Sequence, residues 1–265
     1  MAREAVLLII GLAGQVPFRC SRLSSNVRPH SEAIPRTKIR MSNLNQQFDV
    51  LSNSLRLLPE EIARLKYFVQ EIHEPEEGIC NIELTCVNVF NGLYGMMSAL
   101  KDDGLTTSLY EHDSITTLLC IRHVLVHQSG RLKNNLRDAW LKPIPASPTL
   151  IKYNVSNPAA PDAPLYINVA WFQDGIAKNA KISKKLPAIN AFWNFDTIKQ
   201  KVDSSPHSNW PSTYVCAMTL ITEAVRTLVL RYGNQIAASG FDSNVYLEHF
   251  RDIEAVNTSD YGLVS

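Results

Sequence analysis

The stretch DSITTLLCIRHVLVHQSGRLKN, residues 113–134, decides the fold class of this chain. On a helix each residue advances by about 100°, and here the apolar residues then fall on nearly every side of the axis. A helix that is apolar almost all round is normally buried. The stretch therefore predicts a buried helix over 113–128, with Asp113 or Ser114 as its N-cap and Gly130 as its C-terminal stop.

Four polar side chains interrupt this apolar surface. Thr116, His123 and His127 lie on one narrow strip of the predicted helix, and Arg122 stands about 100–140° away from them. A polar group inside a core needs a partner, since an unpaired one costs about 1–3 kcal/mol. The strip and the arginine are therefore candidate site residues.

Helical spacing of apolar residues continues on both sides of this stretch. It predicts one or two helices over 43–73, with a break at Pro59, and a further apolar helix over 79–101. A short helix is expected over 131–141, and a long one over 211–239, starting at Pro211 and Ser212. The fold class expected is mainly α.

Residues 143–210 interrupt the helical pattern. Six prolines between positions 143 and 164 exclude a continuous helix there. The segments TLIKYNV (149–155) and LYINVAWF (165–172) are rich in β-branched and aromatic residues. They could pair as a hairpin with a long loop. The region is therefore expected to be an irregular, partly β insertion.

The expected organisation has five parts. Residues 1–40 form a disordered or targeting-like N-terminal extension, for which a cleaved signal peptide is the alternative. A helical core over 41–142 precedes the insertion at 143–210. A C-terminal helix over 211–240 completes the core, and 241–265 form a tail that is weakly helical at best.

Composition limits the class of protein. With 265 residues, 45% of them hydrophobic and 19% charged, the chain fits one large globular domain. The net charge of +1 argues against a large non-specific DNA binder. Its five cysteines include no C-x-x-C pair and indicate free, mostly buried thiols in a reducing, cytoplasmic compartment. No segment reaches the roughly eighteen apolar residues of a membrane span, so no membrane partner is expected.

The run Arg122-His123-Val124-Leu125-Val126-His127, followed by Gln-Ser-Gly, resembles the HEPN superfamily, whose helical domains carry Arg-x4–6-His near the end of a core helix. The resemblance implies a HEPN-like antiparallel helical bundle and a metal-independent endoribonuclease without a cofactor. It implies a site shared by the two chains of a homodimer, with RNA as substrate. A role as a toxin or defence effector, with an antitoxin or nucleotidyltransferase partner, is also implied.

The chemistry suits these residue types. A histidine with a pKa near 6.5 can move a proton at neutral pH, and an arginine fork can hold a phosphate. His127, in the last helical turn, lies where the helix dipole favours a protonated imidazole. The catalytic candidates are Arg122, His127 and His123, and Glu83 on the neighbouring helix is a candidate orienting acid.

Other interpretations remain open. Arg122 could form a structural ion pair with Glu83 or Glu223, and the chain could be a non-catalytic dimerisation or nucleotide/RNA-binding module. His123 and His127, four residues apart, could share a zinc ion, although Val124 stands where H-E-x-x-H has its glutamate.

Overall fold

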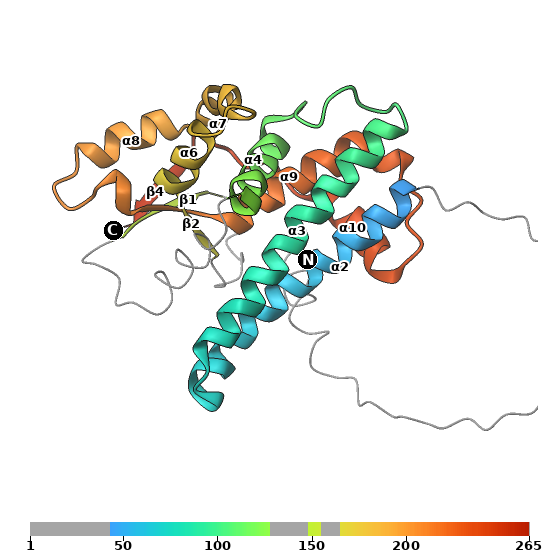
Figure 1. The fold of residues 1–265 in the computed structure, drawn as a ribbon, viewed down its shortest axis with the longest axis horizontal. Helices are drawn as coiled ribbons and strands as arrows, with labels where there is room; N and C mark the ends of the chain where they lie inside the picture. The colour runs from blue at the N-terminus through green and yellow to red at the C-terminus, as the bar shows by residue number, and fades with distance from the viewer. Residues whose placement is uncertain (1–42, 128–147, 155–164, 265) are drawn as a thin grey trace, which may run out of the picture.

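The structure, a computed structural model, describes residues 43–127, 148–154 and 165–264. These residues form eight α-helices and a four-stranded mixed sheet, so the mainly α prediction is confirmed (Figure 1). The extension at 1–40 and the helix expected at 131–141 lie outside the described residues.

Two long antiparallel helices, joined by a π-helical turn at Phe68–Ile72, form a hairpin that projects from the body (Figure 1). They are α2 (Asn43–Tyr67) and α3 (Pro75–Asp102). The break predicted at Pro59 is wrong, because Pro59 lies inside α2. Proline removes one backbone N–H donor. Buried leucines on both sides of it, including Leu58, keep packing against the neighbouring helix and hold α2 together.

The buried helix predicted from the opening stretch is confirmed as α4 (Asp113–His127). It lies at the centre of the molecule, between the hairpin, α9 (Ala217–Tyr232) and the helices of the insertion (Figure 1). The Ser114 hydroxyl donates a hydrogen bond of 3.0 Å to Thr227 Oγ1 on α9. Residues 114–121 are all buried, which agrees with the all-round apolar pattern.

The hairpin predicted within the insertion is wrong. The strands β1 (Thr149–Tyr153) and β2 (Tyr166–Asn168) do not pair with each other. Between them lies β3 (Thr213–Cys216), parallel to β1 and antiparallel to β2, and β4 (Tyr261–Val264) flanks β1 on the other side. The β3 residues were expected to begin the last helix, but the β-branched pair Thr213 and Val215 is buried in the sheet.

The insertion is also more helical than its prolines suggested. It contains α6 (Val169–Ala177), α7 (Leu186–Phe192) and α8 (Phe195–Asp203), which lie beside the sheet (Figure 1). The segment predicted as one strand changes to helix at Asn168, whose side chain caps α6 by accepting from the Trp171 N–H at 2.8 Å.

Trp193 connects the insertion to the central helix. Its fully buried side chain donates from Nε1 to Thr117 Oγ1 on α4 at 2.8 Å. Its backbone carbonyl accepts a hydrogen bond of 2.5 Å from the hydroxyl of Tyr153 on β1. The buried side chain of Trp193 therefore joins the insertion to α4, and Tyr153 joins β1 to the same residue.

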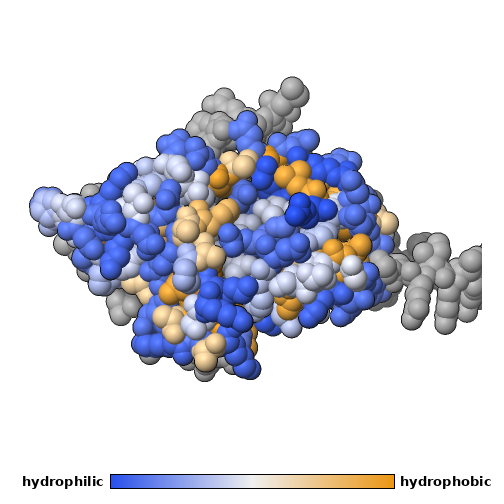
Figure 2. Space-filling view, turned by 90° about the horizontal axis from the view of Figure 1, so that it is seen from above, coloured by the Kyte–Doolittle hydropathy of each residue, from blue (hydrophilic) through white to orange (hydrophobic). Residues whose placement is uncertain are grey.

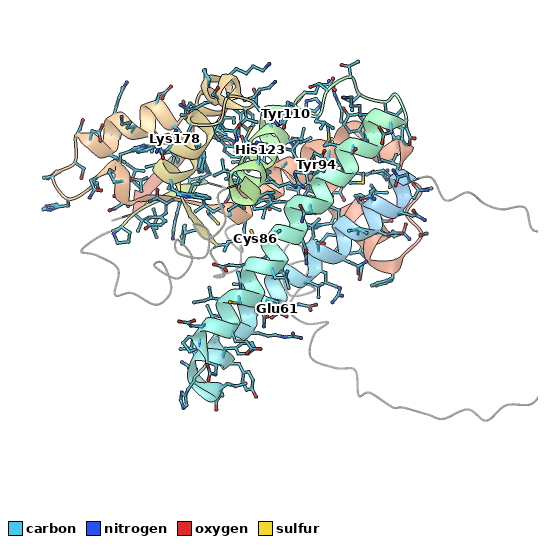
Figure 3. The ribbon with its side chains drawn as sticks, in the orientation of Figure 1. Glu61, Cys86, Tyr94, Tyr110, His123 and Lys178 are labelled. Carbon is cyan, nitrogen blue, oxygen red and sulfur yellow. The ribbon has the colours of Figure 1, made fainter. Side chains whose placement is uncertain are left out.

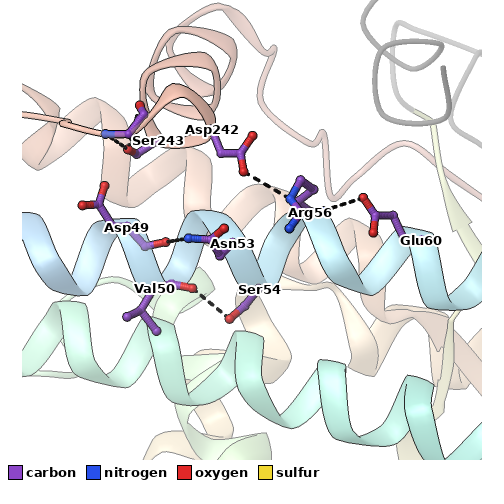
Figure 4. Close-up of polar contacts among 9 residues, drawn as sticks. Asp49, Val50, Asn53, Ser54, Arg56, Glu60, Asp242 and Ser243 are labelled. Atoms are coloured by element: carbon purple, nitrogen blue, oxygen red, sulfur yellow. Dashed lines mark hydrogen bonds and ion pairs between the residues drawn. The ribbon is translucent and has the colours of Figure 1, made fainter. Parts of the chain in front are cut away.

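The C-terminal segment has more regular structure than the weakly helical tail that the sequence predicts. Helix α10 (Phe241–Asp252) packs against α2 and α9, and β4 completes the sheet edge. Figure 4 shows Arg56 of α2 between Asp242 of α10, at 3.1 Å, and Glu60, at 2.8 Å. The buried Phe250 adds apolar contact on the same helix.

The described cysteines, Cys80, Cys86, Cys120 and Cys216, are free thiols, as predicted; Cys20 lies outside the described residues. Burial raises the pKa of Cys86 and of Cys120 to about 12.

On the face shown in Figure 2, hydrophilic residues predominate and apolar ones form small separate patches. Within 43–127, 148–154 and 165–264, no helix combines the length and the hydropathy of a membrane span.

Candidate functional site

Arg122 extends from α4 onto one face of α3. Its Nε donates a hydrogen bond of 2.7 Å to Asn91 Oδ1, and its Cζ lies 4.2 Å from the centroid of the Tyr94 ring. Asn91 and Tyr94 are three residues apart, so one helical turn places both on the same face of α3. The guanidinium is thus fixed by two neutral partners.

No carboxylate pairs with Arg122 within the part of the chain that the structure describes. The alternative ion pair with Glu223 is wrong. Glu223 lies 3.3 Å from Arg226 Nη1 and accepts a hydrogen bond of 3.0 Å from the Val256 backbone N–H. A cation held by an amide oxygen and an aromatic ring keeps its full charge, which leaves it able to bind an anion.

The two candidate histidines occupy the last turns of α4. His123 follows Arg122 in the sequence and is half-buried, and Figure 3 shows it on α4. His127 is the last residue of α4, and its side chain lies outside the described part of the structure. Thr116, the third member of the predicted strip, is 1% exposed and belongs to the core.

Glu83 lies on α3, eight residues before Asn91, which is about 12 Å along a helix axis. Burial and the neighbouring Glu83 carboxylate raise the pKa of Cys86. Because α3 and α4 run in opposite directions (Figure 1), Glu83 lies on the part of α3 toward which the His127 end of α4 points. Its orienting role toward His127 stays a prediction.

Four residues near Arg122 were missed by the sequence reasoning. Asn91 and Tyr94 share the face of α3 that Arg122 contacts, Tyr110 lies just before α4, and Lys185 ends the short 3-10 turn Ser183–Lys185. The Lys185 Nζ lies 5.3 Å from the centroid of the Tyr110 ring. The i, i+3 spacing of Asn91 and Tyr94 predicts a shared face, but only packing reveals its neighbour.

A second polar cluster fixes the segment that carries Tyr110. The Glu111 carboxylate accepts hydrogen bonds from the Thr106 hydroxyl and, at 3.2 Å, from the hydroxyl of Tyr232 on α9. The His112 ring lies 6.3 Å from the Tyr232 ring. Burial, and then the nearby Arg231, lower the pKa of His112. The only carboxylate adjacent in sequence to Tyr110 is therefore engaged with α9.

Comparisons of the chain with protein-family models, curated proteins and solved structures found no match. Among the residues that the structure describes, no three histidine, cysteine or acidic side chains come together as a metal site.

Proposed function

We propose that this protein is a HEPN-type endoribonuclease that cleaves RNA without a metal ion. The observation that carries the proposal is the set of contacts that the Arg122 guanidinium makes. Asn91 and Tyr94 fix its guanidinium without neutralising it, five residues before a histidine that ends the same helix. Cleavage of a phosphodiester requires a cation that holds the phosphate and an imidazole that can move a proton, and Arg122 and His127 are the candidates for these two roles.

The proposed reaction uses the substrate's own nucleophile. The ribose 2′-oxygen attacks the adjacent phosphorus while a histidine takes the 2′-hydroxyl proton. The bond from phosphorus to the 5′-oxygen breaks, and a second histidine supplies the proton that this oxygen needs. The products are a 2′,3′-cyclic phosphate and a 5′-hydroxyl end. Arg122 holds the phosphate and stabilises the charge that develops on it, while His127 and His123 are the candidate acid and base.

The proposed site closes between two chains. Arg122 and His127 are about 7.5 Å apart along one helix and point in directions about 140° apart. A single helix therefore does not place both side chains around one phosphate. A homodimer that brings the two α4 C-termini together would. The proposal also includes a cytoplasmic toxin or defence role, with an antitoxin or nucleotidyltransferase partner. This part rests on the sequence resemblance alone.

The test is cleavage of a single-stranded RNA in EDTA by wild type, Arg122→Ala and His127→Ala. We expect each substitution to lower the single-turnover rate by at least about 100-fold, in line with the loss of one acid–base or oxyanion-stabilising group. The matched controls are Arg64→Ala, on the projecting hairpin with its partner Glu61, and His207→Ala, on an exposed loop. Undiminished cleavage by His127→Ala would overturn the proposal.

One observation favours a second function, that of a non-catalytic helical dimerisation or RNA-binding module. The contacts of Arg122 with Asn91 and Tyr94 join α4 to α3, and a purely structural arginine would make the same contacts. This function predicts RNA binding or dimerisation without cleavage, and a lower melting temperature for Arg122→Ala. Cleavage that disappears in Arg122→Ala while the melting temperature stays unchanged would exclude it.

A further inference from the structure

Two tyrosines and two cations lie together on one side of α4. Tyr94 comes from α3, Tyr110 from the segment before α4, Arg122 from α4 and Lys185 from the insertion. Each cation lies over one ring: the Arg122 Cζ is 4.2 Å from the Tyr94 centroid, and the Lys185 Nζ is 5.3 Å from the Tyr110 centroid. Figure 3 shows Tyr94 and Tyr110 close to each other beside α4.

Two other members of the group, Tyr94 and Arg122, act on the hydroxyl of Tyr110. Burial raises the pKa of its hydroxyl, as do Cys120 and Tyr94, whereas Arg122 lowers it. No Asp or Glu within the described ranges is among the groups that shift this pKa. Among the described residues, the cluster therefore places two cations beside two aromatic rings, and no carboxylate there shifts the pKa of Tyr110.

The surface is accessible. Tyr94 is 37% exposed, and Tyr110, Arg122 and Lys185 are each partly exposed. Two cations from distant parts of the sequence converge here on two aromatic rings. Rings and guanidinium planes stack on unpaired bases, and ammonium and guanidinium groups bind phosphates. An acidic peptide would bind the two cations but would bring no base to stack on the rings or on the guanidinium.

We infer that Tyr94, Tyr110, Arg122 and Lys185 form a platform that binds an unpaired RNA nucleotide, with its base stacked on the platform and its phosphate at Lys185. This inference rests on the proposed function, since it names single-stranded RNA as the substrate class of that site. It assigns specificity to the platform: paired bases inside an A-form duplex offer no free ring face and are excluded. The insertion acquires a role here, because it supplies Lys185.

The experiment measures binding separately from cleavage. Fluorescence anisotropy with a 2′-O-methyl single-stranded oligonucleotide, which lacks the attacking hydroxyl, reports affinity for wild type, Tyr94→Leu, Tyr110→Leu and Lys185→Gln. We expect Tyr94→Leu and Tyr110→Leu each to weaken binding by about 5- to 100-fold, the range for loss of one stacked base. Lys185→Gln should reduce the slope of log affinity against log salt by about 0.7, the value for one phosphate contact on a single strand.

Tyr67→Leu, at the C-terminus of α2, and Lys178→Gln, directly after α6, are the matched controls, because both side chains are well exposed and lie outside the platform. Both should bind as wild type does. Wild-type affinity in the two tyrosine variants, equal binding of duplex RNA, or equal binding of polyglutamate would each overturn the inference. Lys185→Gln keeps the test valid if a tyrosine variant folds poorly.

The two proposals fail in different ways. If His127→Ala still cleaves RNA while the tyrosine variants lose affinity, the catalytic assignment fails and the platform stands. If cleavage requires His127 while the tyrosine variants bind normally, the platform fails and the ribonuclease assignment stands. A wild-type protein that binds no single-stranded RNA would overturn both.

Discussion

Gly92 sets the distance between the two hairpin helices, one residue after Asn91 and two before Tyr94. A Cβ placed on Gly92 would lie 3.0 Å from Leu51 Cα and 3.3 Å from its Cδ1. The first of these atoms is backbone and cannot rotate away, so Gly92→Ala must push α2 and α3 apart. Overpacking of this kind costs about 1–3 kcal/mol, against about 1 kcal/mol gained from the better helix propensity of alanine. The difference is a net loss of up to about 2 kcal/mol, and we expect a value near the middle of that range, about 1 kcal/mol.

Gly95 provides the matched control on the same helix. A Cβ placed there would meet only the side chain of Gln47, whose end is flexible and can move into solvent. Gly95→Ala should therefore be neutral or stabilising, by up to about 1 kcal/mol. Thermal unfolding followed by circular dichroism would show Gly92→Ala melting several degrees below wild type, since about 1 kcal/mol shifts the midpoint by about 2–4 °C. Equal shifts in the two variants would refute the close approach at Leu51.

Three further predictions concern the core and its titrating groups. Trp193→Phe should lower the free energy of unfolding by about 1–3 kcal/mol, measured by urea titration, because it removes the buried hydrogen bond to Thr117 and leaves a gap. Cys86 and Cys120, whose pKa values are about 12, should resist a thiol reagent at neutral pH until the protein unfolds, and rapid labelling of the native state would contradict their burial. The lowered pKa of His112 means that the folded state disfavours its protonation. Stability is then unaffected above its ordinary pKa of about 6.5 and declines as pH falls from there through the folded-state pKa. His112→Gln should flatten that decline, and an unchanged profile would contradict the assignment.

The helices were predictable where one periodic pattern determines both burial and conformation. The apolar residues around Leu118 repeat on all sides of a helix, and the structure buries α4 accordingly. Pro59 misled the prediction because local propensity indicates a break, whereas packing on both sides of it holds α2 together. Local preference decides a boundary only where tertiary contacts are weak.

The sheet could not be predicted, because its pairing is set by segments far apart in the sequence. Ile151 of β1 lies opposite Val215 of β3 and Leu263 of β4. A short apolar run such as the one around Val215 fits a strand or a buried helix equally well. The predicted strands β1 and β2 exist, but β3 separates them.

The candidate site was predictable only in part. Arg122 and His123 stood out because polar groups on an apolar helix need partners, and the structure supplies Asn91 and Tyr94 for Arg122. The partners themselves lie about 30 residues away on another helix, and Lys185 comes from a region expected to be irregular. No pattern within one segment of sequence indicates which face of a helix its neighbour will cover.

In the proposed mechanism the RNA 2′-hydroxyl attacks under the action of Arg122 and His127. The most direct measurement incubates a single-stranded RNA and its 2′-O-methyl counterpart with the wild-type protein in EDTA and identifies the product ends. We expect cleavage of the RNA alone, with 2′,3′-cyclic phosphate and 5′-hydroxyl ends, and none with His127→Ala. Cleavage of the 2′-O-methyl strand, or activity that EDTA abolishes, would contradict the account.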